Sequence, residues 1–211
     1  MRINSRHATA ALLAVFLCSC AGTTIKQKWK APGYTGGPVR KVAMLAVDQR
    51  TLLRQALENR YATQFIKQGE SAIITYDLLS LEDIKGNKEA AAERFRKAGA
   101  DSVLIVRLVD APTYSSQVQT LPTAYRPEIA GFDYYGWYNY FSLAYLGMGT
   151  TWSTMQQDVY LDNSLYELKT GQRVWSGLTK TVFREDTDRL DEIDPLVRKV
   201  FKGLQEDGLV Q

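Results

Sequence analysis

The sequence predicts an α+β fold. It is a single layered domain with the order β-α-β-α-β, a long aromatic insertion, an antiparallel β-hairpin and a C-terminal helix. Three observations lead to this prediction. Apolar strand-like runs alternate with helix-like segments between residues 41 and 109. Two further strand-like runs flank a short turn at residues 169–172. An amphipathic stripe of helical period then follows residue 194.

The first half of the predicted domain contains three strands and two helices. Val42–Val47 is a nearly continuous apolar run, which is typical of a strand covered on both faces. Apolar residues recur every four positions over Leu53–Phe65 and predict an amphipathic helix. Ala72–Leu79 predicts a second strand, Asn87–Ala98 a second helix with an Asn cap, and Ser102–Val109 a third strand.

The second half predicts a hairpin and a final helix. Met155–Leu168 and Arg173–Glu185 form two long antiparallel strands, joined by a turn that places Gly171 at a position of positive φ. Pro195 occupies the first position of the last helix, where its missing N–H costs nothing. We expect the Trp175 ring to pack under this helix or against the sheet.

The first twenty residues have the features of a secretory signal. Arg2 and Arg6 precede an uncharged run over residues 8–17, which is too short to span a bilayer. The ending Leu17-Cys18-Ser19-Cys20 resembles a bacterial lipobox. That resemblance implies diacylglycerol on the Cys20 sulfur, cleavage before Cys20 and acylation of the new amino terminus. The alternative is an ordinary secreted protein whose signal contains two chance cysteines.

The chain therefore divides into three predicted parts. Residues 1–19 are a lipoprotein signal peptide, and residues 20–40, rich in Gly and Pro, are a flexible tether. Residues 41–211 are a periplasmic α+β domain with an aromatic insertion at 110–154. By resemblance to Gram-negative lipoprotein sorting, Ala21 after the cysteine implies a lipid anchor in the outer membrane, with the domain facing the periplasm.

Composition excludes several classes of function. Lys and Arg number 26 and Asp and Glu 23, and loss of the signal removes Arg2 and Arg6, which leaves a net charge of +1. Nucleic-acid binding, which needs a concentrated basic surface, is not expected. Signal removal also takes His7 and Cys18. Imidazole-dependent nucleophilic sites and His- or Cys-ligated metals are thereby excluded, and we expect no metal and no cofactor. Paired carboxylates remain possible, so a cell-wall or glycan-acting enzyme is the alternative function.

The aromatic insertion is the most unusual segment. Nine of the twenty-one residues from 132 to 152 are aromatic, and residues 134–157 carry no charge. Three interpretations stay open: a loop that buries its rings on the sheet, a surface for a partner, and contact with the bilayer. The candidate contact residues are Trp137, Tyr138, Tyr140, Phe141, Tyr145 and Trp152.

Three stretches carry a resemblance to known envelope proteins: Lys41–Val47, Ala98–Ile105 with its Gly-Ala-Asp start, and Leu165–Gly177 with the sequence LYELKTGQRVWSG. They resemble the group that contains the curli-secretion lipoprotein, the penicillin-binding-protein activator and the TolB amino-terminal domain. The resemblance implies the same order of elements and raises a further alternative, a subunit of an oligomeric outer-membrane secretion pore. Barrel building would favour two uncharged segments, and this chain has one.

These observations together predict a non-enzymatic binding, adaptor or assembly subunit of the cell envelope. Its partners would be the outer membrane, reached through the lipid on Cys20, and an envelope protein or a second copy of the chain. We expect no catalytic residue.

Overall fold

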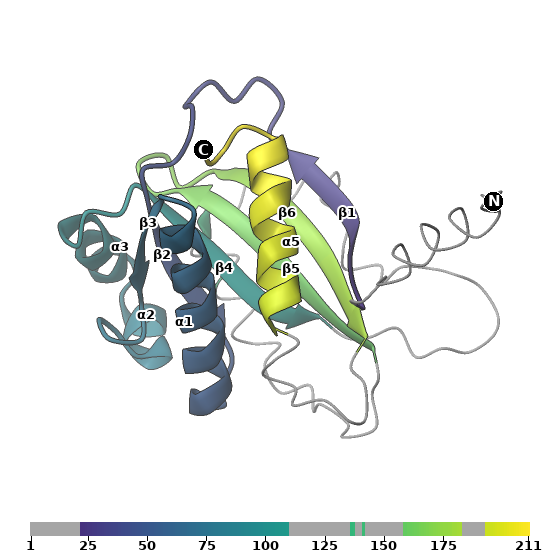
Figure 1. The fold of residues 1–211 in the computed structure, drawn as a ribbon. Coiled ribbons are helices and arrows are strands. Elements are labelled where there is room, and N and C mark those ends of the chain that lie inside the picture. The colour runs from purple at the N-terminus through teal and green to yellow at the C-terminus, as the bar shows by residue number, and fades with distance from the viewer. Residues whose placement is uncertain (1–21, 110–135, 138–140, 142–157, 183–192) are drawn as a thin grey trace, which may run out of the picture.

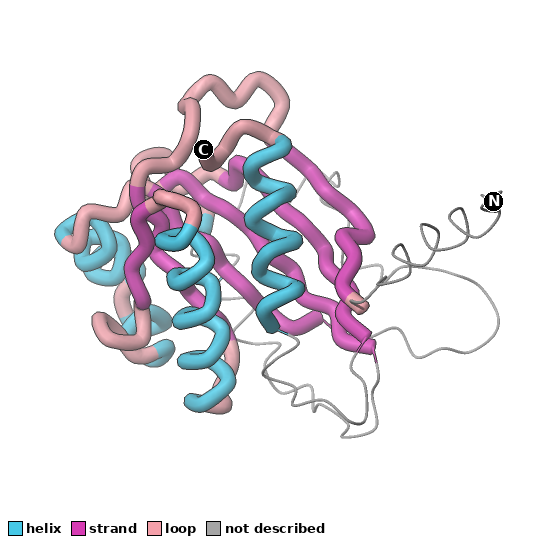
Figure 2. Tube along the Cα trace, viewed as in Figure 1, coloured by secondary structure: helices cyan, strands magenta, loops and turns pink. Residues whose placement is uncertain are grey.

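The computed structural model describes residues 22–109, 136–137, 141, 158–182 and 193–211. In these residues it contains one six-stranded sheet and four helices (Figures 1 and 2). The elements are β1 (Thr23–Lys30), β2 (Lys41–Val47), α1 (Thr51–Lys67), β3 (Ser71–Ile74), α2 (Leu81–Gly86), α3 (Lys88–Lys97), β4 (Ser102–Val109), β5 (Asp158–Glu167), β6 (Arg173–Val182) and α5 (Ile193–Glu206).

The sheet is mixed, with the strand order β1-β6-β5-β4-β2-β3. β2 runs parallel to both β3 and β4, while β4, β5, β6 and β1 pair antiparallel in succession. The chain runs from β2 through α1 to β3, and then through α2 and α3 to β4 on the other side of β2, as parallel strands need crossover connections. The predicted α+β class is confirmed.

α1 and α5 lie side by side on one face of the sheet (Figure 1). The core beneath them is built from the alternate apolar residues of the central strands, including Met44, Leu104 and Leu165. The rings of Phe65 on α1 and Phe201 on α5 meet edge to face, with centroids 5.1 Å apart. This contact joins the two helices into one layer.

A second core fills the opposite face, beneath α2 and α3. Ile84 and Phe95 from these helices are fully buried, and they pack with strand residues such as Ile105 and Tyr166. Because β2 and β4 contribute to both cores, each contains a continuous apolar run, Val42–Val47 in β2 and Val103–Val106 in β4.

Residues 20–40 were predicted to be a tether, and for Thr23–Lys30 this prediction is wrong. These residues form β1, an edge strand paired with β6 from Thr23 opposite Thr181 to Lys30 opposite Trp175. The physical reason is visible in the sequence. Burial alternates along the strand, with Ile25 partly buried and the lysines exposed. That period of two is the pattern of a half-covered strand.

The second predicted strand is shorter than expected. β3 ends at Ile74, because the next two N–H groups donate to the Glu58 carboxylate of α1: Thr75 N to Oε2 at 2.8 Å and Tyr76 N to Oε2 at 2.8 Å. A turn follows, and then α2, a helix that the sequence analysis did not predict. Ser80 and Asp83 cap its first turn reciprocally.

The hairpin and the last helix agree with the prediction over the described residues, except that α5 begins at Ile193, so Pro195 is its third residue and not its first. Gly171 has a φ of 73° in the β5–β6 turn, and Gly208 has a φ of 69° where α5 ends. Trp175 is fully buried between β6 and α5. The predicted extensions at residues 155–157 and 183–185 lie outside the described residues.

Candidate functional site

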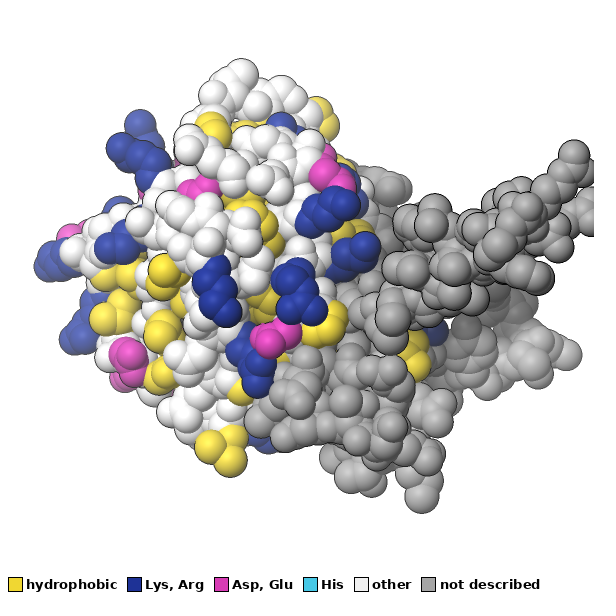
Figure 3. Space-filling view, viewed as in Figure 1, with side chains coloured by type: hydrophobic (Ala, Val, Ile, Leu, Met, Phe, Trp, Pro, Cys, Tyr) yellow, Lys and Arg dark blue, Asp and Glu magenta, His cyan; other side chains and the backbone are white. Residues whose placement is uncertain are grey.

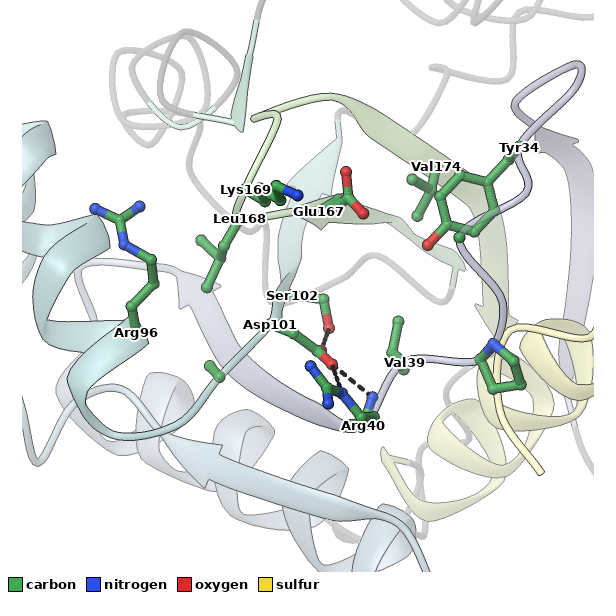
Figure 4. Close-up of a pocket in the computed structure, with 13 residues that line it drawn as sticks. Tyr34, Val39, Arg40, Arg96, Asp101, Ser102, Glu167, Leu168, Lys169 and Val174 are labelled. Atoms are coloured by element: carbon green, nitrogen blue, oxygen red, sulfur yellow. Dashed lines mark hydrogen bonds and ion pairs between the residues drawn. The ribbon is translucent and has the colours of Figure 1, made fainter.

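A cavity of about 430 Å³ opens at the end of the sheet where β4 begins and β5 ends (Figure 4). The segment that follows β1 forms one wall, with Tyr34 and Val39, and the start of the hairpin turn forms another, with Glu167 and Leu168. The charged side chains of the lining come from four separate parts of the chain: Arg40, Arg96, Asp101, Glu167 and Lys169.

Asp101 is the best-connected side chain in this cavity. Its Oδ2 accepts the Arg40 backbone N–H at 2.9 Å and the Arg40 Nε at 3.4 Å. Its Oδ1 accepts the Ser102 hydroxyl at 3.1 Å and the Lys41 backbone N–H at 3.4 Å. The carboxylate therefore ties the start of β2 to the start of β4. This role gives the Gly-Ala-Asp strand start of the sequence a structural explanation.

Tyr34 supplies a neutral hydroxyl to the cavity. Burial, together with the carboxylates of Glu167 and Asp101, raises the pKa of the Tyr34 phenol above its ordinary value of 10.0. The side chain thus stays protonated at neutral pH and can both donate and accept a hydrogen bond. Arg40, whose side chain is 90 % exposed, and Lys169 add positive charge at the cavity. This arrangement suits a polar group of a partner or ligand.

A second hollow of about 410 Å³ is lined by Arg96 and Lys169 as well, and so adjoins the cavity. Its other walls come from the first turn of α3 and from Trp137, whose backbone N–H donates to the Gly171 carbonyl at 3.0 Å. Gly136 makes this approach possible, because a Cβ there would lie 3.2 Å from the Gly171 oxygen. The hairpin turn and the aromatic insertion are therefore in direct contact.

Two of the six candidate contact residues lie in described parts of the insertion, and both are buried. Trp137 is 6 % exposed and Phe141 is fully buried, in the core beneath α3. The ring of Trp137 lies 6.1 Å from that of Phe95. These two side chains pack inside the domain, so their assignment as contacts for a partner or membrane is wrong. Burial of the rings on the sheet, the first of the three interpretations, describes them.

The other predicted site residues lie outside the described part of the chain. They are Cys20, Tyr138, Tyr140, Tyr145 and Trp152. Their roles remain predictions.

The carboxylate of the strand residue Asp162 is engaged inside the sheet. This side chain is buried and lies 3.5 Å from the Arg107 guanidinium, and it also accepts the Ser164 hydroxyl. In the described residues, no group of three His, Cys, Asp or Glu side chains is placed to hold a metal ion. No helix in the same residues is long and apolar enough to cross a membrane.

Sequence reasoning missed the cavity for two reasons. Tyr34 and Arg40 were assigned to a tether, although Gly33 and Gly37, both with positive φ, mark a shaped turn. Asp101 was recognised only as part of a strand-start motif. A polar residue directly before a buried apolar strand is the signal that could have identified it, since such a residue lies at the end of the strand and not inside the sheet.

No protein-family model matches this sequence, and no curated protein sequence matches it. Among solved structures, the chain is similar to the PelC dodecamer from Paraburkholderia phytofirmans. The TM-score is 0.48 and the identity 13 %, over 87 % of this chain and 97 % of that one. A second PelC crystal form gives the same TM-score at 14 % identity. Lipoprotein GNA1162 from Neisseria meningitidis is similar with a TM-score of 0.40 and 12 % identity, over 79 % of this chain and 99 % of that one.

Proposed function

We propose that this protein is a lipid-anchored binding subunit of the bacterial outer membrane, without enzymatic activity. The observation that carries the proposal is the position of the lipobox-like sequence. Cys20 stands three residues before Thr23, the first residue of a sheet strand, so the attachment point leads directly into a folded domain. The domain would act by holding a partner, either another envelope protein or a second copy of the chain.

The cavity is the candidate binding site for such a partner. β1 has eight residues and is therefore about 26 Å long at 3.3 Å per residue. The chain reaches the cavity wall only after the far end of this strand, at Tyr34. The cavity thus lies at the opposite end of β1 from the anchor, clear of the attachment point.

The cavity carboxylates favour binding over catalysis. A general acid or base needs a carboxyl oxygen that can exchange a proton with the substrate. Both oxygens of Asp101 are already engaged, by Ser102 and by the backbone at the start of β2. Glu167 accepts the Thr170 hydroxyl at 2.7 Å in the hairpin turn. Asp101 thus serves the architecture, which supports a non-enzymatic role over an enzyme that uses a pair of carboxylates.

Fatty-acid labelling in cells tests the anchor. Cys20→Ala should abolish incorporation of labelled palmitate and leave the unprocessed precursor, because the sulfur that receives the lipid is gone. Cys18→Ala is the matched control and should be labelled and processed normally. Normal processing and membrane retention of the Cys20→Ala protein would refute the proposal.

Crosslinking tests the binding role. Tyr34→Ala and Lys169→Glu change the cavity while sparing the hydrogen bonds of Asp101, so both proteins should remain folded. We expect them to lose crosslinked species that the lipidated wild-type protein forms in the envelope, whether with itself or with another protein. If both variants keep every crosslinked species, the cavity is not the binding site.

A further inference from the structure

We propose that the outer surface of β1 and α5 rests on an anionic phospholipid surface and orients the domain on the membrane. This inference rests on the proposed lipid anchor and adds the face that the anchor presents to the bilayer. The face is defined by the exposed side chains of the two elements: Lys26, Lys28, Lys30, Arg198, Lys199, Lys202, Gln205 and Glu206. Figure 3 shows dark-blue side chains gathered over this part of the molecule.

The charge of this face differs from that of the rest of the chain. β1, α5 and Asp207 together carry six cationic and three acidic side chains, an excess of three positive charges. The residues from Cys20 onward have a net charge of only +1. The remainder of the mature chain is therefore slightly acidic, and the positive excess is concentrated on two adjacent elements.

In the part of the chain that the structure describes, most cations of this face are not paired with an acidic side chain. Lys28 lies 3.3 Å from Glu206 and 3.2 Å from Asp207, so two of the three acids serve one lysine. The third acid, Asp194, pairs with Arg60 of α1 at 2.8 Å. Within the described ranges, no ion pair joins the remaining five cations of the face to an acidic side chain: Lys26, Lys30, Arg198, Lys199 and Lys202.

The helix presents its cations because its other side is fixed in the core. Leu196, Val200 and Leu204 are buried beneath α5, at helical spacing. Arg198, Lys199 and Lys202 lie on the opposite side and are exposed. α5 packs directly against β1, since a Cβ on Gly203 of α5 would lie 3.0 Å from the Ile25 side chain of β1.

The chain between the anchor and β1 is short, and this makes the membrane the expected contact of the basic face. Three residues, from Cys20 to Thr23, span at most about 10 Å in extended form. The electrostatic screening length is also about 10 Å at 0.1 M salt. The start of β1 is thus held within the distance at which basic side chains are attracted to anionic headgroups. A domain that reorients freely would need a long flexible tether, but residues 23–30 of the predicted tether form β1.

Site-specific quenching in vesicles tests the orientation. The purified lipidated protein is reconstituted into vesicles of phosphatidylethanolamine and phosphatidylglycerol that contain a nitroxide-headgroup lipid. Because Cys20 is capped, a single introduced cysteine can be labelled with a fluorophore. Gln205→Cys places the probe on the face without changing its charge. Ser71→Cys places the control probe on β3, at the opposite edge of the sheet.

We expect the probe at position 205 to be quenched several-fold more than the probe at position 71. The difference should shrink in 1 M salt and in vesicles of phosphatidylcholine alone. Charge reversal by Arg198→Glu, Lys199→Glu and Lys202→Glu should reduce it as well. The matched control reverses three exposed cations elsewhere, with Lys67→Glu, Lys88→Glu and Lys97→Glu, and should preserve the difference.

The outcomes separate this inference from the anchor itself. Protein that fails to float with vesicles overturns the anchor and this inference with it. Protein that floats while positions 205 and 71 are quenched equally overturns the orientation alone and leaves the anchor standing. In that case the basic face is open to an acidic macromolecule. If position 205 is quenched more than position 71, but neither salt nor charge reversal changes this difference, the electrostatic basis of the proposal is overturned.

Discussion

The indole ring of Trp175 lies across Gly177, and a Cβ at position 177 would stand 2.4 Å from the ring atom Cη2. Gly203 of α5 closes the other side, where a Cβ would lie 3.2 Å from Cζ2. The indole N–H donates to Asp207 Oδ2 at 2.8 Å just after the helix. The glycine of the Val-Trp-Ser-Gly sequence thus makes room for the Trp175 ring, which packs between the strand and the helix.

Gly177→Ala should therefore destabilise the domain. The added methyl group collides with a ring that is buried on all sides, and overpacking of this kind costs about 1–3 kcal/mol. Chemical denaturation with urea measures the loss. Gly86→Ala in α2 is the matched control, because nothing lies within 4 Å of a Cβ there and its φ is not in the left-handed region. It should be neutral or slightly stabilising. Equal losses of stability for both variants would show that the methyl group at position 177 does not collide with the Trp175 ring.

The hydrogen bond between Trp175 and Asp207 can be tested separately from the packing. Trp175→Ala should cost about 3–5 kcal/mol, since the whole ring is removed from the core. Asp207→Ala keeps the ring but leaves its buried N–H without an acceptor, at a cost of about 1–3 kcal/mol. Glu206→Ala changes the preceding residue, which is 54 % exposed, and should alter stability by less than about 1 kcal/mol. An Asp207→Ala protein as stable as the Glu206→Ala protein would show that the bond contributes little.

A buried ion pair within α1 lies against the turn after β3, where the Thr75 and Tyr76 N–H groups donate to the Glu58 carboxylate. Arg54 Nε donates to Glu58 Oε1 at 2.9 Å, and the two side chains are 9 % and 0 % exposed. Glu58→Gln should destabilise the domain by about 3 kcal/mol, because it leaves the Arg54 charge buried without its counterion. The exposed pair of Glu93 and Arg96 is the control, and Glu93→Gln should cost less than about 1 kcal/mol. Thermal or urea unfolding measures the stability of both variants. Similar losses of stability for Glu58→Gln and Glu93→Gln would contradict the prediction.

The fold was largely predictable because its strands and helices carry strong periodic patterns. β2, β4 and α5 begin and end within a few residues of the expected positions. The β1 strand was missed because residues 31–38, rich in Gly and Pro, suggested one continuous linker. β3 was predicted too long because its end depends on Glu58, a side chain that approaches from another element. Such a tertiary contact leaves no mark in the local sequence.

The candidate site was much less predictable than the fold. Its lining comes from segments far apart in the chain, such as Tyr34, Arg96 and Glu167, and only the sheet order brings them together. The aromatic insertion drew attention by its composition alone. Composition does not distinguish a ring that faces a partner from one that faces the core, and Trp137 and Phe141 belong to the second kind.

Tyr61 should make stability sensitive to alkaline pH. Complete burial raises the pKa of its phenol well above the ordinary value of 10.0, and its hydroxyl donates to Asn163 Oδ1. Above pH 10 the unfolded chain releases this proton while the folded chain keeps it. The folded state then binds more protons, so stability falls as pH rises, by up to about 1.4 kcal/mol per pH unit for this group.

The test for Tyr61 is the urea midpoint of the wild-type and Tyr61→Phe proteins between pH 7 and pH 11. At pH 7 the variant should be less stable by about 1–3 kcal/mol, because Asn163 Oδ1 loses its donor inside the core. Above pH 10 its stability should fall less steeply than that of the wild type. Parallel curves for the two proteins would show that Tyr61 does not resist ionisation.

The last prediction separates the core residues of the aromatic insertion from the others. Phe141 and Trp137 are buried against α3, so Trp137→Ala and Phe141→Ala should each cost about 3–5 kcal/mol. Tyr138→Ala and Tyr140→Ala change neighbouring rings of the same segment and are the matched comparison. If those rings serve a partner or the membrane, both variants should keep the wild-type stability, within about 0.5 kcal/mol, and lose crosslinked species or vesicle contact. Chemical denaturation beside size-exclusion chromatography distinguishes the two groups. Equal destabilisation by all four substitutions would place the segment as a whole in the core, and an unchanged stability for Trp137→Ala would contradict its burial.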